Sequence, residues 1–212
     1  MYLGLSVLAI CLASCKTEVK VDETTTSTDT TKVATTEEAP EVKLDSVAEM
    51  KAWTAYMTPG DAHKMMADET GSWNNDMTFW HEPEGEPMKS TSTSEVKMIL
   101  GGRYQEMTYK GDMMGMSFEG RGTLSFDNST KEYTSIWIDN MGTGMMVMKG
   151  KMAPGSNTIE LKGEMVDPAY NKVRPCRELY TIVDDNTRKM EMFCTKNGKE
   201  FKTMEIVMKR KK

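Results

Sequence analysis

The chain has 212 residues, a formal net charge of −5 at pH 7 and a pI near 5.3. Proteins that bind nucleic acids cluster Lys and Arg against the phosphate backbone. Because this chain has no basic stripe, we expect no nucleic-acid partner. Only two histidines are present, which leaves little for histidine-based catalysis or metal binding.

The chain begins with a short apolar stretch that ends at a cysteine. Residues 7–12 are mostly apolar, and Leu12-Ala13-Ser14-Cys15 closes the stretch. An apolar run of this length ending at small residues is typical of a secretory signal and is too short to span a bilayer. The pattern predicts a bacterial lipoprotein signal over residues 1–15, with Cys15 acylated as the mature N-terminus. The alternative is a buried N-terminal strand, and residues 1–4 lack the usual positive charge.

An acylated Cys15 makes a membrane the expected partner. Stable anchoring takes more than one acyl chain, and bacterial lipoproteins, which this signal resembles, carry two or three such chains, palmitate among them, on one cysteine. We therefore expect a lipid-anchored protein of the bacterial cell envelope. Lys16 rather than Asp follows the cysteine, which by the same resemblance favours the outer membrane.

Residues 16–44 predict a disordered tether. The segment is rich in Thr, Glu, Asp and Lys and has no aromatic residue. It cannot bury enough apolar area to offset the entropy of ordering it; a Thr-rich glycosylated stalk is the alternative. Residues 45–212 remain, enough for a single domain with a real core.

Two short helices are expected to open this domain. Ser46-x-x-Glu49 has the form of a capping box, and apolar residues recur behind it at helical spacing. Thr58-Pro59 predicts the N-cap and first turn of a second helix that ends before Gly71.

From Gly71 onwards the pattern changes to alternation interrupted by turn residues. The turns include Asn197-Gly198, a strong hairpin signal. A meander of about ten strands rarely stays open, so we predict an all-β, antiparallel up-and-down barrel. The expected strands cover residues 72–80, 90–99, 102–111, 117–126, 132–140, 144–152, 157–166, 175–183, 188–195 and 200–209.

Cys176 and Cys194 flank a predicted hairpin with its turn at residues 184–187. Symmetric pairing about that turn places the two cysteines opposite one another, and an oxidising compartment permits a disulfide. Two free thiols, one residue out of register, are the alternative. No histidine lies in this half of the chain, and we expect no metal site and no cofactor.

The domain resembles the bacterial family known as domain of unknown function 1579, over about residues 53–210. The resemblance rests on motifs that occur in order: Gly101-Gly102-Arg103, Phe118-Glu119-Gly120, Trp137-Ile138-Asp139 and Met141-Gly142-Thr143-Gly144. It supports the domain and implies little about activity.

A broader resemblance is to the calycins, the barrels of lipocalins and fatty-acid-binding proteins. Those open their first strand with Gly-x-Trp and pack a late Arg or Lys over the indole. Here Gly71-Ser72-Trp73 supplies the first part, and Lys209 or Arg210 could supply the second. Barrels of this size can hold one small ligand.

The leading hypothesis is a non-enzymatic envelope lipoprotein that binds a small, partly apolar ligand inside the barrel. The pocket would be lined by aromatic and thioether side chains, with Arg121 at a polar end and Asp139 beside it. An inward-facing arginine suits a carboxylate or phosphate. The candidate pocket residues are Trp73, Arg103, Tyr104, Met116, Arg121, Trp137 and Asp139.

Three alternatives stay open. The first is an interaction or structural lipoprotein with a filled barrel, its protein partner unknown. The second is Cu(I) binding through the Met clusters around residues 113–116 and 145–148, since thioethers are soft ligands; alternation, however, divides those sulfurs between two faces. The third is an enzyme with Asp139 and Glu119 as acid and base. Arg177 and Glu178 fall on opposite faces of their strand, and none of these hypotheses assigns them a function.

Overall fold

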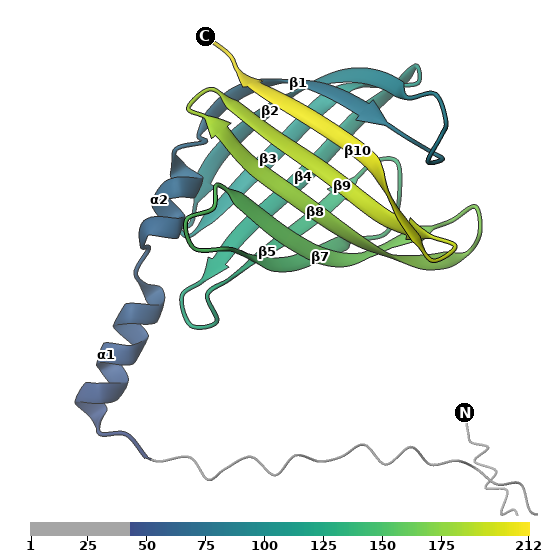
Figure 1. Cartoon of the computed structure of the whole chain (residues 1–212). Helices are drawn as coiled ribbons and strands as arrows, with labels where there is room; N and C mark the ends of the chain where they lie inside the picture. Colours follow the sequence, from purple (N-terminus) through teal and green to yellow (C-terminus); the bar gives the residue numbers. More distant parts are fainter. Residues whose placement is uncertain (1–42) are drawn as a thin grey trace, which may run out of the picture. The chain divides into compact units, whose positions relative to one another are not determined.

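The structure is a computed structural model that describes residues 43–212 (Figure 1). The predicted signal, Cys15 and nearly all of the predicted tether lie outside the described residues. Residues 44–212 form one compact unit. No helix within the described residues is long and apolar enough to cross a membrane.

Two helices precede ten strands. The helices are α1 (Ser46–Met57) and α2 (Asp61–Ala67). The strands are β1 (Gly71–Phe79), β2 (Met88–Ile99), β3 (Tyr104–Met113), β4 (Met116–Asp127), β5 (Glu132–Asp139), β6 (Met146–Met152), β7 (Thr158–Asp167), β8 (Lys172–Asp184), β9 (Thr187–Lys196) and β10 (Lys199–Arg210).

Each strand pairs antiparallel with its neighbour in sequence, and β1 pairs with β10 to close the barrel. The prediction of a ten-stranded up-and-down barrel is therefore confirmed. Short turns make this topology possible: between β9 and β10, Asn197 and Gly198 both have positive φ, at 53° and 77°. Such a turn matches the twist of the two strands it joins.

The helix starts differ from those expected. Asp45, not Ser46, caps α1, because its carboxylate accepts a hydrogen bond from the Ala48 backbone N–H at 2.8 Å. The second helix begins at Asp61 behind Gly60 and not at Thr58. Thr58 is instead the C-cap of α1, and its hydroxyl donates to the carbonyl of Thr54.

The barrel interior follows from alternation along the strands. Side chains that face inward form two apolar clusters, one around Trp73 and Ile206 and the other around Leu124, Tyr133 and Leu161. Methionines contribute to both clusters. Because thioether chains are unbranched and flexible, they fill irregular space between strands.

A disulfide joins β8 to β9. Cys176 and Cys194 are direct partners in the ladder, and their sulfurs are bonded. Both cysteines are buried in the core. The expected pairing of the two cysteines is observed, although an irregularity between Ile182 and Asp184 shifts the register by one residue between the turn and the disulfide.

Candidate functional site

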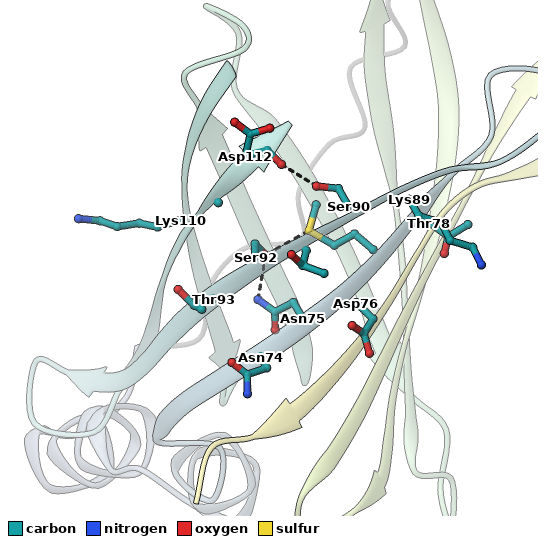
Figure 2. Close-up of a pocket in the computed structure, with 13 residues that line it drawn as sticks. Asn74, Asn75, Asp76, Thr78, Lys89, Ser90, Ser92, Thr93, Lys110 and Asp112 are labelled. Carbon is teal, nitrogen blue, oxygen red and sulfur yellow. Dashed lines mark hydrogen bonds between the residues drawn. The ribbon is translucent and has the colours of Figure 1, made fainter. Parts of the chain in front are cut away.

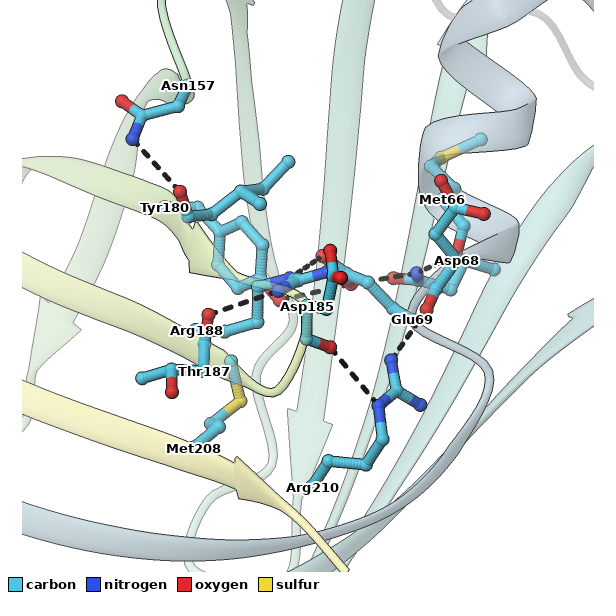
Figure 3. A network of polar contacts seen from close by, with 12 residues as sticks. Met66, Asp68, Glu69, Asn157, Tyr180, Asp185, Thr187, Arg188, Met208 and Arg210 are labelled. Atoms are coloured by element: carbon cyan, nitrogen blue, oxygen red, sulfur yellow. Dashed lines mark hydrogen bonds and ion pairs between the residues drawn. The ribbon is translucent and has the colours of Figure 1, made fainter.

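One end of the barrel is closed by an ion pair inside it. Glu69, in the segment between α2 and β1, accepts from Arg188 Nε at 2.9 Å, and only 4% of either side chain is exposed (Figure 3). The second carboxylate oxygen of Glu69 accepts from Tyr180 Oη and from Gln105 Nε2, both at 3.0 Å. Glu69 therefore connects β3, β8 and β9 through one carboxylate.

The same end holds Trp73 between two guanidinium groups. Arg210 lies 4.3 Å and Arg188 5.5 Å from the centre of the indole, and the indole N–H donates to the Glu69 carbonyl at 2.9 Å. Arg210 also donates to the carbonyl of Asp68 (Figure 3) and to the carbonyl of Thr70. The guanidinium groups are attracted to the indole face by its quadrupole. The hydrogen bonds of Arg210 then hold the segment before β1 across the barrel end.

A different situation holds at Glu178, on the inward face of β8. Its ladder partners are Leu161 on β7 and Met192 on β9, both buried in the core. Burial raises the pKa of this carboxyl to about 7. Among residues 43–212 it has no hydrogen-bond or ion-pair partner, yet part of its side chain remains accessible.

The Glu178 oxygens therefore border accessible space within the wall of strands. Within the described part of the chain, the one fully enclosed side-chain polar atom without a partner is Gln105 Oε1. The Glu178 oxygens also lack a partner but are not fully enclosed, so water can reach them. An ionisable group in such a position is a candidate functional group.

A group of aromatic side chains lies on strands across the barrel from this carboxyl. In the barrel order β3 lies opposite β8, and Tyr109 of β3 packs edge-on against Trp137 of β5 with ring centres 5.2 Å apart. Phe118 of β4 stacks on the same indole at 6.4 Å. Burial raises the pKa of Tyr109 well above its usual value, and the charges of Glu69 and Glu178 raise it further. Tyr109 therefore lies within electrostatic reach of both carboxylates.

Glycines on β4 make room for the indole. Gly122 is the ladder partner of Trp137, and a β-carbon at Gly120 would clash with the indole ring. Trp137 Nε1 donates to Asp139 Oδ2 at 2.6 Å, which fixes the ring orientation. The ring thus lies flat on β4 and stays partly accessible.

A groove of about 1000 Å³ lies over β1, β2 and β3 (Figure 2). It is lined by the inward-facing Met77, Ser90 and Ser92 and also by outward-facing side chains such as Lys89 and Lys110. The β2–β3 ladder ends at Ser92 and Gly111, and beyond that pair the Ser90 hydroxyl donates to the Asp112 carbonyl at 2.6 Å. The groove therefore meets both faces of the barrel wall.

The predicted pocket residues divide between the two faces. Trp73, Trp137 and Asp139 face inward, on β1 and β5. Trp73 is enclosed by the Arg188–Arg210 network and is only 1% exposed, while Trp137 and Asp139 lie toward the opposite end of the barrel. Arg210, rather than Lys209, packs over the Trp73 indole.

Four of the candidates do not face the interior. Arg121 and Tyr104 point outward from β4 and β3, Met116 lies exposed beside the β3–β4 turn, and Arg103 lies in the turn before β3. The placement of Arg121 at the polar end of the pocket was wrong, because the buried Phe118, Leu124 and their glycine neighbours take the inward positions of β4. Glu119 is also outward, opposite in face to Asp139, so these two carboxylates do not form an acid–base pair.

The residues that sequence reasoning missed are Glu69, Tyr109, Glu178 and Arg188. Glu178 was detectable in principle, because it lies two residues from Cys176 and therefore on the same strand face. Glu69 carried no signal, since it lies outside any strand.

Histidine contributes no site. His63 is buried on α2, where its Nδ1 accepts from the Gly60 N–H at 3.1 Å and its ring meets Phe126 edge-on. Burial lowers its pKa, and the charge of Arg103 lowers it further. His81 lies exposed after β1. Residues 43–212 contain no cluster of His, Cys, Asp and Glu suited to a metal ion.

Comparison with known proteins gives the family. The profile of the family described as "Protein of unknown function (DUF1579)" matches residues 58–210. The chain belongs to this family. No curated protein matches its sequence. A solved structure, the crystal structure of Rv2717c from M. tuberculosis, has a TM-score of 0.54 at 14% identity, over 73% of this chain and 100% of that one. At that identity the similarity concerns the fold alone.

The Glu69–Arg188 pair generates a stability prediction. Arg188→Met should lower the free energy of unfolding by about 3–5 kcal/mol, because it leaves the Glu69 carboxylate buried without its cation. Urea unfolding of the two proteins measures the difference. Arg177→Met is the matched control: its partner Glu200 is 46% exposed, so the loss should stay below about 1 kcal/mol. Equal losses in the two variants would contradict the assignment.

Glu178 generates a pH-dependent prediction. Its pKa rises from 4.5 in the unfolded chain to about 7 in the barrel, so its destabilising effect is absent below about pH 4.5, grows through this window and is complete above it. Glu178→Met should therefore raise the unfolding free energy more at about pH 8 than at about pH 5, by at most about 3 kcal/mol.

Urea unfolding of wild type and Glu178→Met at several pH values measures this difference. The control is Glu164→Met, an exposed outward position on β7, which should show no such trend. A gain from Glu178→Met that does not depend on pH would contradict the prediction.

Proposed function

We propose that this protein binds a small, partly apolar molecule inside its barrel and is held at the bacterial cell envelope by an acylated Cys15. The first part draws on the described residues. The second draws on the pattern of residues 1–15 alone.

One observation carries the ligand proposal: inward-facing side chains on several strands keep accessible surface inside a closed barrel. A tightly filled interior would bury all of them, because protein cores leave few voids larger than a water molecule. The space they border is therefore a candidate binding cavity. These side chains are Met107, Trp137, Glu178, Tyr180, Met190 and Met204.

The chemistry of the wall supports a ligand that is mostly apolar. Met107, Met190 and Met204 pack against both core clusters, and flexible thioether chains adapt to ligands of varied shape. The Glu69–Arg188 pair closes one end of the barrel. The groove at β2 and β3 is therefore a better candidate for the ligand's entrance than that closed end.

A second candidate function is a protein-binding surface at the end of the barrel opposite Glu69. Turns and strand ends there expose apolar side chains, and such groups gather where proteins meet partners. Met114 and Met145 are each 62% exposed. The other members are Met116, Met141, Val166, Tyr170 and Val173.

The ligand proposal predicts binding of a neutral apolar fluorophore, N-phenyl-1-naphthylamine, with one site per chain. Ser135 faces inward between Leu124 and Met148, so Ser135→Phe should fill the cavity and weaken binding about tenfold or more. Fluorescence titration of the full-length protein measures both affinities.

The matched control is Thr134→Phe, the adjacent residue on the outer face, which should bind as wild type does. Thermal unfolding checks that both variants fold. If the fluorophore binds Ser135→Phe as tightly as wild type, it binds the exposed apolar end, and the protein-binding function is favoured.

The anchoring proposal predicts that Cys15→Ala abolishes incorporation of labelled palmitate and releases the protein from the membrane fraction of bacterial cells. Cys11→Ala is the control, because Cys11 lies within the apolar stretch and should leave labelling intact. Palmitate incorporation in Cys15→Ala equal to wild type would overturn the proposal.

A further inference from the structure

The Glu178 carboxyl stands out because the inward basic groups on its own strand and on the strands beside it already have partners. Arg174 on β8 pairs with Asp167 at 2.6 Å, and Arg188 on β9 pairs with Glu69 at 2.9 Å. Arg210 is occupied by backbone carbonyls and the Trp73 indole. No cation of the described residues is left for Glu178.

An unpaired carboxylate among apolar side chains is costly, because water no longer solvates it fully. Leu161 and Met192 flank it along the sheet and offer no hydrogen bond. A ligand that carries a positive charge would compensate the Glu178 carboxylate on binding, and this would explain why a carboxyl group lies there.

The opposite wall suits a cation as well. Tyr109, Phe118 and Trp137 form one connected aromatic group, with neighbouring ring centres 5.2 and 6.4 Å apart. Aromatic faces attract ammonium groups, and more strongly when the contact is shielded from water. A carboxylate facing aromatic rings is therefore a combination that selects a protonated amine.

We infer that the barrel binds an amphiphilic amine, with its ammonium group at Glu178 and its apolar body among the methionines. The inference rests on the proposed function, since it names the ligand class for the same cavity. It also excludes the carboxylate ligand that an inward Arg121 would have favoured: an anionic headgroup would meet Glu178 with no free cation beside it.

Ionisation of Glu178 must control this binding. The titratable groups that face it are Tyr180 on its own strand, Tyr109 on the opposite wall, and the Glu69–Arg188 pair toward the closed end. The inward side chains of β7 beside it, Ile159, Leu161 and Gly163, do not titrate. Both tyrosines keep their protons near neutral pH, because burial raises their pKa values. Glu178 is thus the group that changes charge in that range.

The test compares three compounds of equal chain length, octylamine, octanol and octanoate, by calorimetric titration of the full-length protein near pH 8. Octylamine should bind about tenfold more tightly than octanol, and octanoate should bind weakest. Near pH 5 the preference for the amine should shrink, because Glu178 is then protonated while the amine stays charged.

Glu178→Gln keeps the shape of the side chain and should remove the preference for octylamine over octanol. Octanol binding by the same variant checks that the cavity is still formed. Glu164→Gln, an exposed outward position on β7, is the control and should retain the preference.

Equal binding of octylamine and octanol to wild type, or a preference that survives in Glu178→Gln, would overturn the amine assignment and leave the cavity proposal standing. Failure of all three compounds to bind wild type would overturn the proposed function, and the amine assignment with it.

Discussion

Closure of the sheet by pairing β1 with β10 is the constraint on which the rest of this structure depends. It removes both sheet edges and divides every strand into an inner and an outer face. Trp73 and Arg210 are direct partners in that closing ladder. The contact between indole and guanidinium therefore lies at the seam itself, and the segment of Asp68 to Thr70 is tied to the same arginine.

The closed barrel treats its interior charges in two ways. Glu69 and Arg188 compensate each other and bring Tyr180 and Gln105 into one network, so their role is to hold strands in place. Glu178 lies on β8 farther from the closed end. It has no partner among the described residues and has accessible surface beside it. The paired carboxylate, Glu69, therefore marks the closed end of the barrel, and the unpaired one, Glu178, marks the candidate binding region.

The aromatic group opposite Glu178 depends on small residues. Trp137 can lie flat because β4 presents Gly120 and Gly122 beneath it, and Asp139 holds the indole N–H. A larger residue at Gly120 would displace the ring. The β4 glycines and the Trp137–Asp139 pair therefore act together in shaping the inner wall of the barrel.

The strands, their order and the up-and-down barrel could be predicted from the sequence, because alternation and turn residues are local properties. Pairing about the predicted turn also placed Cys176 opposite Cys194, but the β8–β9 ladder reaches this register only through an irregularity between Ile182 and Asp184, which the sequence did not indicate. Which face of each strand lies inside could not be predicted in this way: Arg121 and Tyr104 point outward and Glu178 inward. Alternation shows that a strand has two faces but does not show which one lies inside the barrel, because that depends on residues far away in the chain. The meeting of Glu69 with Arg188, 119 residues apart, is decided in the same way.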